Sequence, residues 1–127
     1  MRVVLMLVAA LALGPMATPV AAEKAGTLLT SCEALIRELR QTGDKVTLVN
    51  DGLLCWHYLS AFQDLATVYD DPSSRRSLLS VCAPPESRLT QFVRIFVAFA
   101  NRHPELLHEP AGLVALRALR EAFPCQS

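Results

Sequence analysis

The residues best suited to chemistry lie together in one short stretch of the chain: His103, Glu105, His108 and Glu109. Two imidazoles beside two carboxylates could provide a general base or hold a metal ion. Prolines within and after this stretch make it a tight turn between two helical patterns, where His and Glu side chains commonly cap helix ends or bond to neighbouring backbone groups. We therefore expect a structural role for all four residues.

Three further polar groups have simpler structural explanations. Cys55 could be a nucleophile with His57 as its base, but residues two apart on a helix do not face each other. Asp64 lies beside an apolar stripe, so we expect it to be partly buried with a hydrogen-bonded or arginine partner. Ser87 precedes a helical pattern and is expected to cap it. The sequence predicts no catalytic residue, no metal site and no cofactor.

Residues 1–22 have the layout of a secretory signal peptide. Arg2 precedes an apolar run over residues 3–13, and the segment closes on Val20-Ala21-Ala22, with small side chains just before the expected cut. A membrane anchor is the alternative, but this run is about half of the ~20 residues that a spanning helix needs. We expect cleavage after Ala22, export to the periplasm, and a mature chain over residues 23–127 without a membrane segment.

The mature chain has the size of one domain and an almost even charge balance. Arg2 leaves with the leader, so 11 Lys plus Arg remain against 12 Asp plus Glu. This balance provides no overall attraction for nucleic acid or for an anionic membrane surface. A chain of this length buries one core with a thin stability margin. We expect a single domain that binds no nucleic acid.

The four cysteines, Cys32, Cys55, Cys82 and Cys125, all belong to the mature chain. An even number behind an export signal favours two disulfides, with three possible pairings. Metal binding through these thiolates and the histidines is the competing interpretation. No Cys-x-x-Cys or paired Cys/His spacing supports it. We expect two disulfides.

The first half of the mature chain shows two amphipathic helical patterns. The first spans residues 25–41, and the second begins at Asn50 or Asp51 and continues to Tyr69, with a loop expected over residues 45–49. Trp56 could anchor a partner, as could Tyr58, although core packing is the more ordinary role for Tyr58. The expected inward residues are Leu28, Leu29, Cys32, Leu35, Ile36, Leu39, Cys55, Tyr58, Leu59, Phe62, Leu65, Ala66 and Tyr69.

The second half shows two more helical patterns after a polar loop over residues 70–76. The third helix is expected from Ser87 to about Asn101, and it is apolar nearly all round, which is typical of a central core helix. A dimer or partner face is the alternative, so a homodimer stays open. The fourth is expected from Pro110 to Phe123, since proline fits a first helical turn. Its expected inward residues are Leu113, Leu116 and Leu119.

Helix lengths suggest which cysteines pair. Helices joined by short connections usually pack antiparallel. Cys32 and Cys55 lie at similar distances from the middle of the connection between the first two helices, so they should be roughly level across that hairpin. In the second hairpin the start of the third helix meets the end of the fourth, which should bring Cys82 beside Cys125. The sequence thus predicts an all-α fold, a small four-helix domain of two antiparallel helical hairpins stapled by the disulfides Cys32–Cys55 and Cys82–Cys125.

At this level of detail the chain resembles the Rap1a/Tai family of periplasmic immunity proteins. The resemblance covers the whole mature chain and is most specific from His103 to Cys125. Two departures fall in the second helix, where His57 stands in place of a common glycine and Ala61 in place of another. The matching residues are Thr27-Leu28-Leu29, Cys32, Cys55, Tyr58-Leu59, Asp64, Cys82-Ala83-Pro84, Gln91-Phe92-Val93, His103-Pro104-Glu105, Leu107-His108, Pro110-Ala111, Ala118-Leu119 and Ala122-Phe123-Pro124-Cys125.

What the resemblance implies is inhibition of another protein rather than catalysis. Family members of this type bind a cell-wall amidase delivered by a type VI secretion system and block its active site. The expected partner is thus a secreted amidase-type effector, and the expected location is the periplasm. The resemblance assigns the four cysteines and the residues that bound the helices, but it assigns no partner-binding residue. A general periplasmic module, such as a stress or folding chaperone without a toxin, is the alternative function.

Overall fold

The computed structural model describes residues 21–42, 50–69 and 77–126 of the chain. Within them the helices are α1 (Ala25–Thr42), α2 (Asn50–Ala66), α3 (Leu89–Arg102) and α4 (Ala111–Ala122), with a short 3₁₀ turn, η1 (Pro104–Leu106), before α4. The described part has two isolated β-bridges and no longer strand. The expected all-α architecture is therefore confirmed. The leader and the loops expected over residues 45–49 and 70–76 lie outside the described residues.

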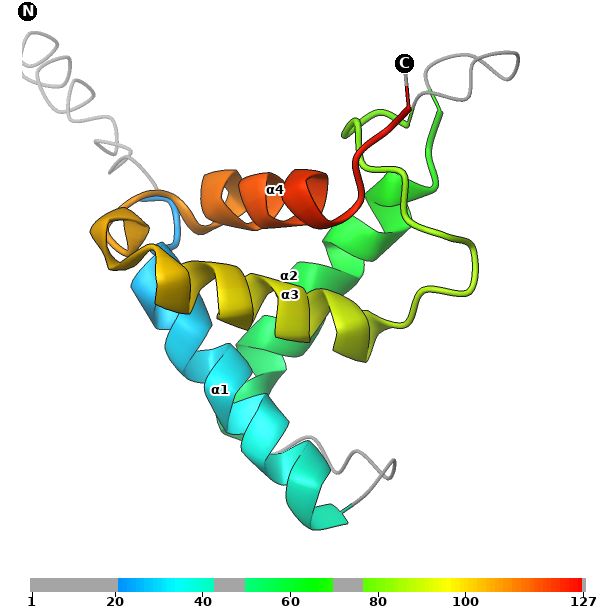
Figure 1. Ribbon diagram of the computed structural model, residues 1–127. Coiled ribbons are helices and arrows are strands. Elements are labelled where there is room, and N and C mark those ends of the chain that lie inside the picture. Colours follow the sequence, from blue (N-terminus) through cyan, green and yellow to red (C-terminus); the bar gives the residue numbers. More distant parts are fainter. Residues whose placement is uncertain (1–20, 43–49, 70–76, 127) are drawn as a thin grey trace, which may run out of the picture.

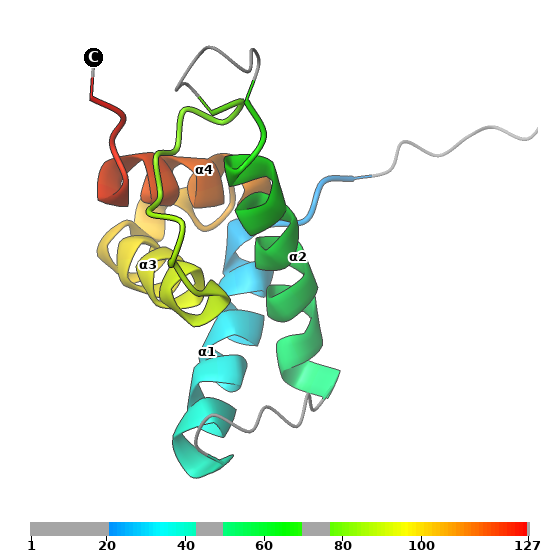
Figure 2. The same ribbon diagram turned by 90° about the vertical axis from the view of Figure 1, so that its right-hand side faces the viewer.

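Helices α1 and α2 form an antiparallel hairpin that opens like a V, and α3 crosses between its arms (Figure 1). Turned by 90°, α3 and α4 lie together on one side of the molecule and α2 on the other (Figure 2). Helix α3 packs against α1, α2 and α4. Its side chains Phe92, Val93, Phe96, Phe99 and Ala100 are buried, so the apolar girth of this helix is explained by a central place in the core.

The contact between α1 and α2 is unusually close at the start of α2. The Ser31 hydroxyl donates to the Asp51 carbonyl at 2.6 Å and accepts from the Cys55 N–H at 3.1 Å. The Asp51 carbonyl and the Cys55 N–H are four residues apart, and in a regular helix they would bond to each other. Here a side chain of α1 lies between them. At the same point, Cys55 forms a disulfide with Cys32, the residue after Ser31, and the two Cα atoms are 4.9 Å apart.

The hairpin of α3 and α4 is closed at its open end by the second disulfide. Cys82 and Cys125 have Cα atoms 5.0 Å apart, and the Cys82 N–H donates to the Phe123 carbonyl at 2.9 Å. Both pairings are those expected from helix length. Along the hairpin, small side chains let the two helices approach closely: Ala111, Val114, Ala115, Ala118 and Leu119 are the buried residues of α4.

Backbone hydrogen bonds link the start of α1 to the turn before α4. The N–H groups of Ala25 and Gly26, which have no acceptor inside α1, donate to the carbonyls of Glu109 and Leu107, each at 2.9 Å. In return the Glu23 carbonyl accepts from the Ala111 N–H at 2.7 Å. We name this set of bonds the N-terminal clasp. It joins the two hairpins, which each have only their own disulfide.

Three sequence-based expectations about helix ends are wrong. Helix α2 ends at Ala66, because Thr67 N–H and hydroxyl both donate to the Asp64 carbonyl and close a tight last turn. Tyr69 consequently forms a bridge with Ser77 and is exposed. Helix α3 starts at Leu89, and Arg88 occupies its N-cap position with no side-chain cap, so Ser87 does not cap it.

Two expectations about burial are also wrong. Leu113 points outward from α4 and is exposed, because the inward face of α4 is formed by the smaller residues beside it. Leu65 is exposed too, since it stands in the last turn of α2 where the helix leaves the core. The first helix begins at Ala25 as expected, and the second begins at Asn50.

Candidate functional site

The His/Glu turn forms two separate surface pairs rather than one site. His103 lies against the Phe99 ring with centroids 4.4 Å apart, and its Nδ1 is 3.0 Å from Glu105 Oε1. A second pair, His108 with Glu109, has an N–O distance of 3.3 Å. Backbone and His103 hydrogen bonds lower the pKa of the exposed Glu105 carboxyl. The four side chains pair with each other and none caps a helix, so the expected side-chain capping is not seen; the structural role of this turn comes from its backbone, which supplies the acceptor carbonyls of the clasp.

The other candidate residues do not converge either. Cys55 is bonded to Cys32 and is not a nucleophile, and His57 is exposed on the outside of α2. Asp64 is exposed, so the expected partial burial is wrong: the early end of α2 leaves its side chain in solvent. Trp56 is partly buried against the main core cluster, and no strongly exposed anchor is formed there.

Tyr58 links α2 to the start of α4. Its ring stacks on Phe62 with centroids 5.9 Å apart, and a Cβ added to Gly112 would lie 3.3 Å from the phenol oxygen. Burial raises the pKa of this phenol, a hydrogen bond with the Gly112 backbone lowers it, and the Glu23 charge raises it further. These contacts give Tyr58 the packing role expected from the sequence.

Among the residues that the structure describes, no group of three His, Cys, Asp or Glu side chains is placed to hold a metal ion. In the same part of the chain, no helix is long and apolar enough to cross a membrane.

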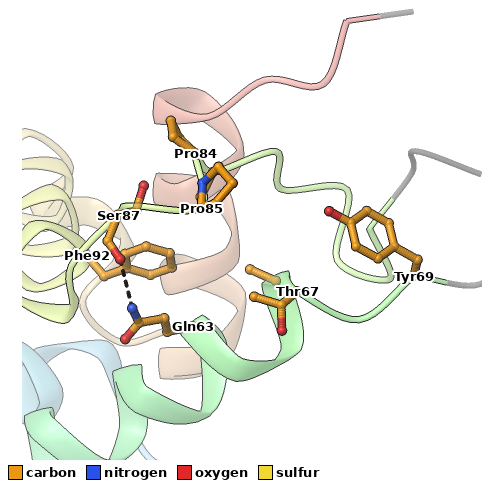
Figure 3. Close-up of a pocket in the computed structure, with 9 residues that line it drawn as sticks. Gln63, Thr67, Tyr69, Pro84, Pro85, Ser87 and Phe92 are labelled. Carbon is orange, nitrogen blue, oxygen red and sulfur yellow. Dashed lines mark hydrogen bonds between the residues drawn. The ribbon is translucent and has the colours of Figure 1, made fainter.

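One small groove lies between the end of α2 and the segment that leads from Cys82 to α3 (Figure 3). Its volume is about 250 Å³, below the range of about 300–1,000 Å³ that small-molecule sites usually have. Phe92 lies at the groove, and the Gln63 amide ties the two walls by donating to the Ser87 carbonyl at 2.9 Å. Pro84 and Pro85 form the rim opposite Thr67.

Beside this groove, four large apolar side chains are exposed: Leu65, Val68, Tyr69 and Leu78. We name them the apolar collar. The Leu78 N–H donates to the Val68 carbonyl at 2.7 Å, and Tyr69 bridges Ser77, so two short segments present these side chains together. Exposed apolar groups that cluster, rather than lie singly, are typical of protein contact surfaces.

Sequence reasoning missed two serines that shape this framework. Ser31 enters the first turn of α2, and Ser77 is buried with its hydroxyl bonded to both the N–H and the carbonyl of Val81. Nothing in the local sequence distinguishes them from surface serines. The apolar collar was not predicted either, because Leu65 and Tyr69 fit the apolar stripe of a second helix that was expected to continue to Tyr69.

Comparison with known proteins assigns the family. A family model described as Rap1a immunity proteins matches residues 24–125. The chain belongs to the Rap1a immunity protein family. The match begins at the clasp and ends at the last cysteine, so it spans both disulfide-closed hairpins. No curated protein and no solved structure matches the chain.

Membership of the Rap1a family points to immunity against a type VI effector, and hence to a protein partner rather than a small substrate. Proteins of immunity families are generally not enzymes. Two disulfides fit an exported protein, because such bonds persist in oxidising compartments.

Proposed function

We propose that this protein is a periplasmic immunity protein that binds a secreted cell-wall amidase and occludes its active site. The observation that carries the proposal is the family match over residues 24–125. The two His/Glu pairs lie apart on the surface and do not converge on one site, which favours a binding role over an enzymatic one. The exposed apolar side chains of the collar are also of the kind that protein interfaces use.

Export by residues 1–22 belongs to the same proposal. The amidase acts in the cell wall, so its inhibitor must be present in the periplasm, where both disulfides also form. Cleavage after Ala22 leaves Glu23 as the first residue, and the Glu23 carbonyl is itself part of the N-terminal clasp. The mature chain, residues 23–127, then folds as one domain that carries no catalytic residue and no cofactor.

The test is a binding and protection experiment with the mature chain. Purified residues 23–127 are titrated against a panel of secreted peptidoglycan amidases, and cleavage of peptidoglycan fragments is measured. We expect one amidase to be inhibited at equimolar protein. In cells, a deletion strain should lose protection against that amidase and regain it from the full chain.

A chain that lacks residues 1–22 is the matched control for location, because it keeps the binding domain but stays in the cytoplasm. It should not protect. Binding to none of the amidases, or full protection by the leaderless chain, would contradict the proposal. Suppression of aggregation of unrelated periplasmic proteins, without any amidase binding, would favour the chaperone alternative.

A further inference from the structure

The charges of this nearly neutral chain are segregated between its two helical hairpins. Helices α3 and α4 carry four arginines and one glutamate, a formal charge of +3. Helices α1 and α2 carry two arginines against four carboxylates, a formal charge of −2. Helix α2 lies on the opposite side of the molecule from α3 and α4, so the even total conceals an uneven distribution of charge (Figure 2).

The four arginines of α3 and α4 point outward, and we name them the arginine face: Arg94, Arg102, Arg117 and Arg120. Arg94 and Arg102 are on the solvent side of α3, since the buried residues of that helix fall on its other side. Arg117 stands four residues before Glu121 on α4, so both share one side of that helix. The salt bridge from Arg102 to Glu121, 2.9 Å long, joins the two exposed sides into one surface.

Two of these guanidinium groups are held in place. Arg102 donates from Nε to the Ala98 carbonyl at 3.3 Å and lies over the Phe99 ring at 5.9 Å. Arg120 donates from Nε to the Leu79 carbonyl at 2.8 Å, so it reaches the segment that carries the apolar collar. A side chain that is already ordered loses less freedom when a partner binds. Half of the arginine face is therefore ordered before any partner binds.

Arg94 and Arg117 have no ion-pair or hydrogen-bond partner among the described residues. Arginine matches a carboxylate with two parallel hydrogen bonds and is enriched at protein interfaces. The only acidic residue on the two helices is Glu121, which Arg102 already engages. Other acids near these helices lie off the two helices themselves: Glu33 of α1 accepts from Asn101 Nδ2 at 3.3 Å, Glu86 precedes α3, and Glu105 and Glu109 lie in the turn, each beside a histidine.

We propose that the arginine face is the docking surface for an acidic patch on the effector amidase. This inference rests on the proposed function and deepens it, because it names the chemistry of the partner surface. Charge complementarity selects this side of the molecule: an acidic patch is attracted by α3 and α4 and repelled by the carboxylates of α1 and α2. Complementary charges of this kind mainly raise the association rate, and salt screens them.

The test compares two double variants with the same change in total charge. Arg94→Glu/Arg117→Glu reverses the two unpaired arginines of the face. Arg37→Glu/Arg40→Glu makes the same change on α1, where both side chains are also exposed. Association rates with the inhibited amidase are measured by stopped flow from about 50 to 500 mM NaCl, after thermal unfolding has shown that both variants keep the native stability.

We expect the first variant to associate roughly tenfold to a hundredfold more slowly than the native chain at the lowest salt, and the difference to shrink as salt rises. The α1 variant should stay within about threefold of the native rate, since its substitutions lie away from the docking surface. An amidase whose most acidic patch is changed to lysine should prefer the first variant over the native chain.

The outcomes separate the two proposals. If the native chain binds an amidase but both variants slow equally, or neither slows, the arginine face is not the docking surface and the immunity role stands. If the native chain binds no amidase in the panel, the proposed function fails and this inference fails with it. If a DNA duplex competes as effectively as the amidase, the face is a general polyanion site and the acidic-patch assignment is overturned.

Discussion

Replacing Gly52 with alanine should destabilise this protein, although alanine is the better helix former. A Cβ at position 52 would lie 3.1 Å from Leu35 Cβ and 3.2 Å from Leu35 Cα. Leu35 is fully buried, and its backbone belongs to α1, so neither atom can move without shifting the helix. Overpacking of a tight core typically costs about 1–3 kcal/mol. Alanine recovers about 1 kcal/mol of helix propensity. We expect a net loss of up to about 2 kcal/mol.

The matched control is Gly112→Ala, which makes the same change in the first turn of α4. There the nearest atoms are the tips of two side chains, Tyr58 Oη at 3.3 Å and Phe62 Cζ at 3.8 Å. A phenol tip can move by a few tenths of an ångström where the α1 backbone cannot. The propensity gain should then dominate, so this variant should be as stable as the native chain or up to about 1 kcal/mol more stable.

Both variants are compared with the native chain by urea unfolding of the oxidised protein, with both disulfides verified by mass mapping. In a domain of this size, 1 kcal/mol corresponds to about 4–8 °C in Tm. The contrast between the two positions is the deciding result. If Gly52→Ala were as stable as Gly112→Ala, the close approach of α1 and α2 would not be rigid, and the explanation for that glycine would be refuted.

Three further predictions follow from the contacts. Ser31→Ala should cost about 1–2 kcal/mol in urea unfolding, because it removes a buried hydroxyl that bonds two backbone groups of α2; full native stability would show that those groups simply bond each other. Glu105→Gln should make the free energy of unfolding less dependent on pH in acid. The pKa of Glu105 is lowered in the folded protein, so its ionised carboxylate stabilises the fold at pH values above 4.5, the ordinary pKa of this group, and that contribution is lost as the pH falls through the folded pKa. Under limited dithiothreitol, the half-buried Cys82–Cys125 bridge should open before the buried α1–α2 bridge, and its loss should cost about 4 kcal/mol, since the two cysteines are 43 positions apart in sequence; alkylation and mass mapping give the order, and the reverse order would contradict the burial argument.

The features that were predictable from the sequence are those set by neighbours along the chain. Apolar periodicity located four helices, and short connections made each pair antiparallel, which was enough to pair Cys32 with Cys55 and Cys82 with Cys125. Helix ends were harder, because they depend on single hydrogen bonds. The periodic stripe continued to Tyr69, but the Thr67 hydroxyl competes for a helix carbonyl and ends α2 earlier.

The features that were not predictable depend on residues distant in sequence. Ser31 has a role only because α2 lies against it, and the N-terminal clasp exists only because the turn before α4 meets the start of α1. The charge distribution is of the same kind. A total near zero argued against an electrostatic role, yet folding places the arginines of α3 and α4 on one surface, and the proposed binding site became visible only then.

The clasp explains how two separately stapled hairpins can present one rigid surface. Each disulfide lies within one hairpin, so neither bond restrains α1 and α2 relative to α3 and α4. That restraint comes from α3 in the core and from the clasp, whose bonds also satisfy the free N–H groups at the start of α1. The helix backbones that carry the arginine face are therefore fixed relative to each other, and a partner that binds there needs to order only the side chains of Arg94 and Arg117.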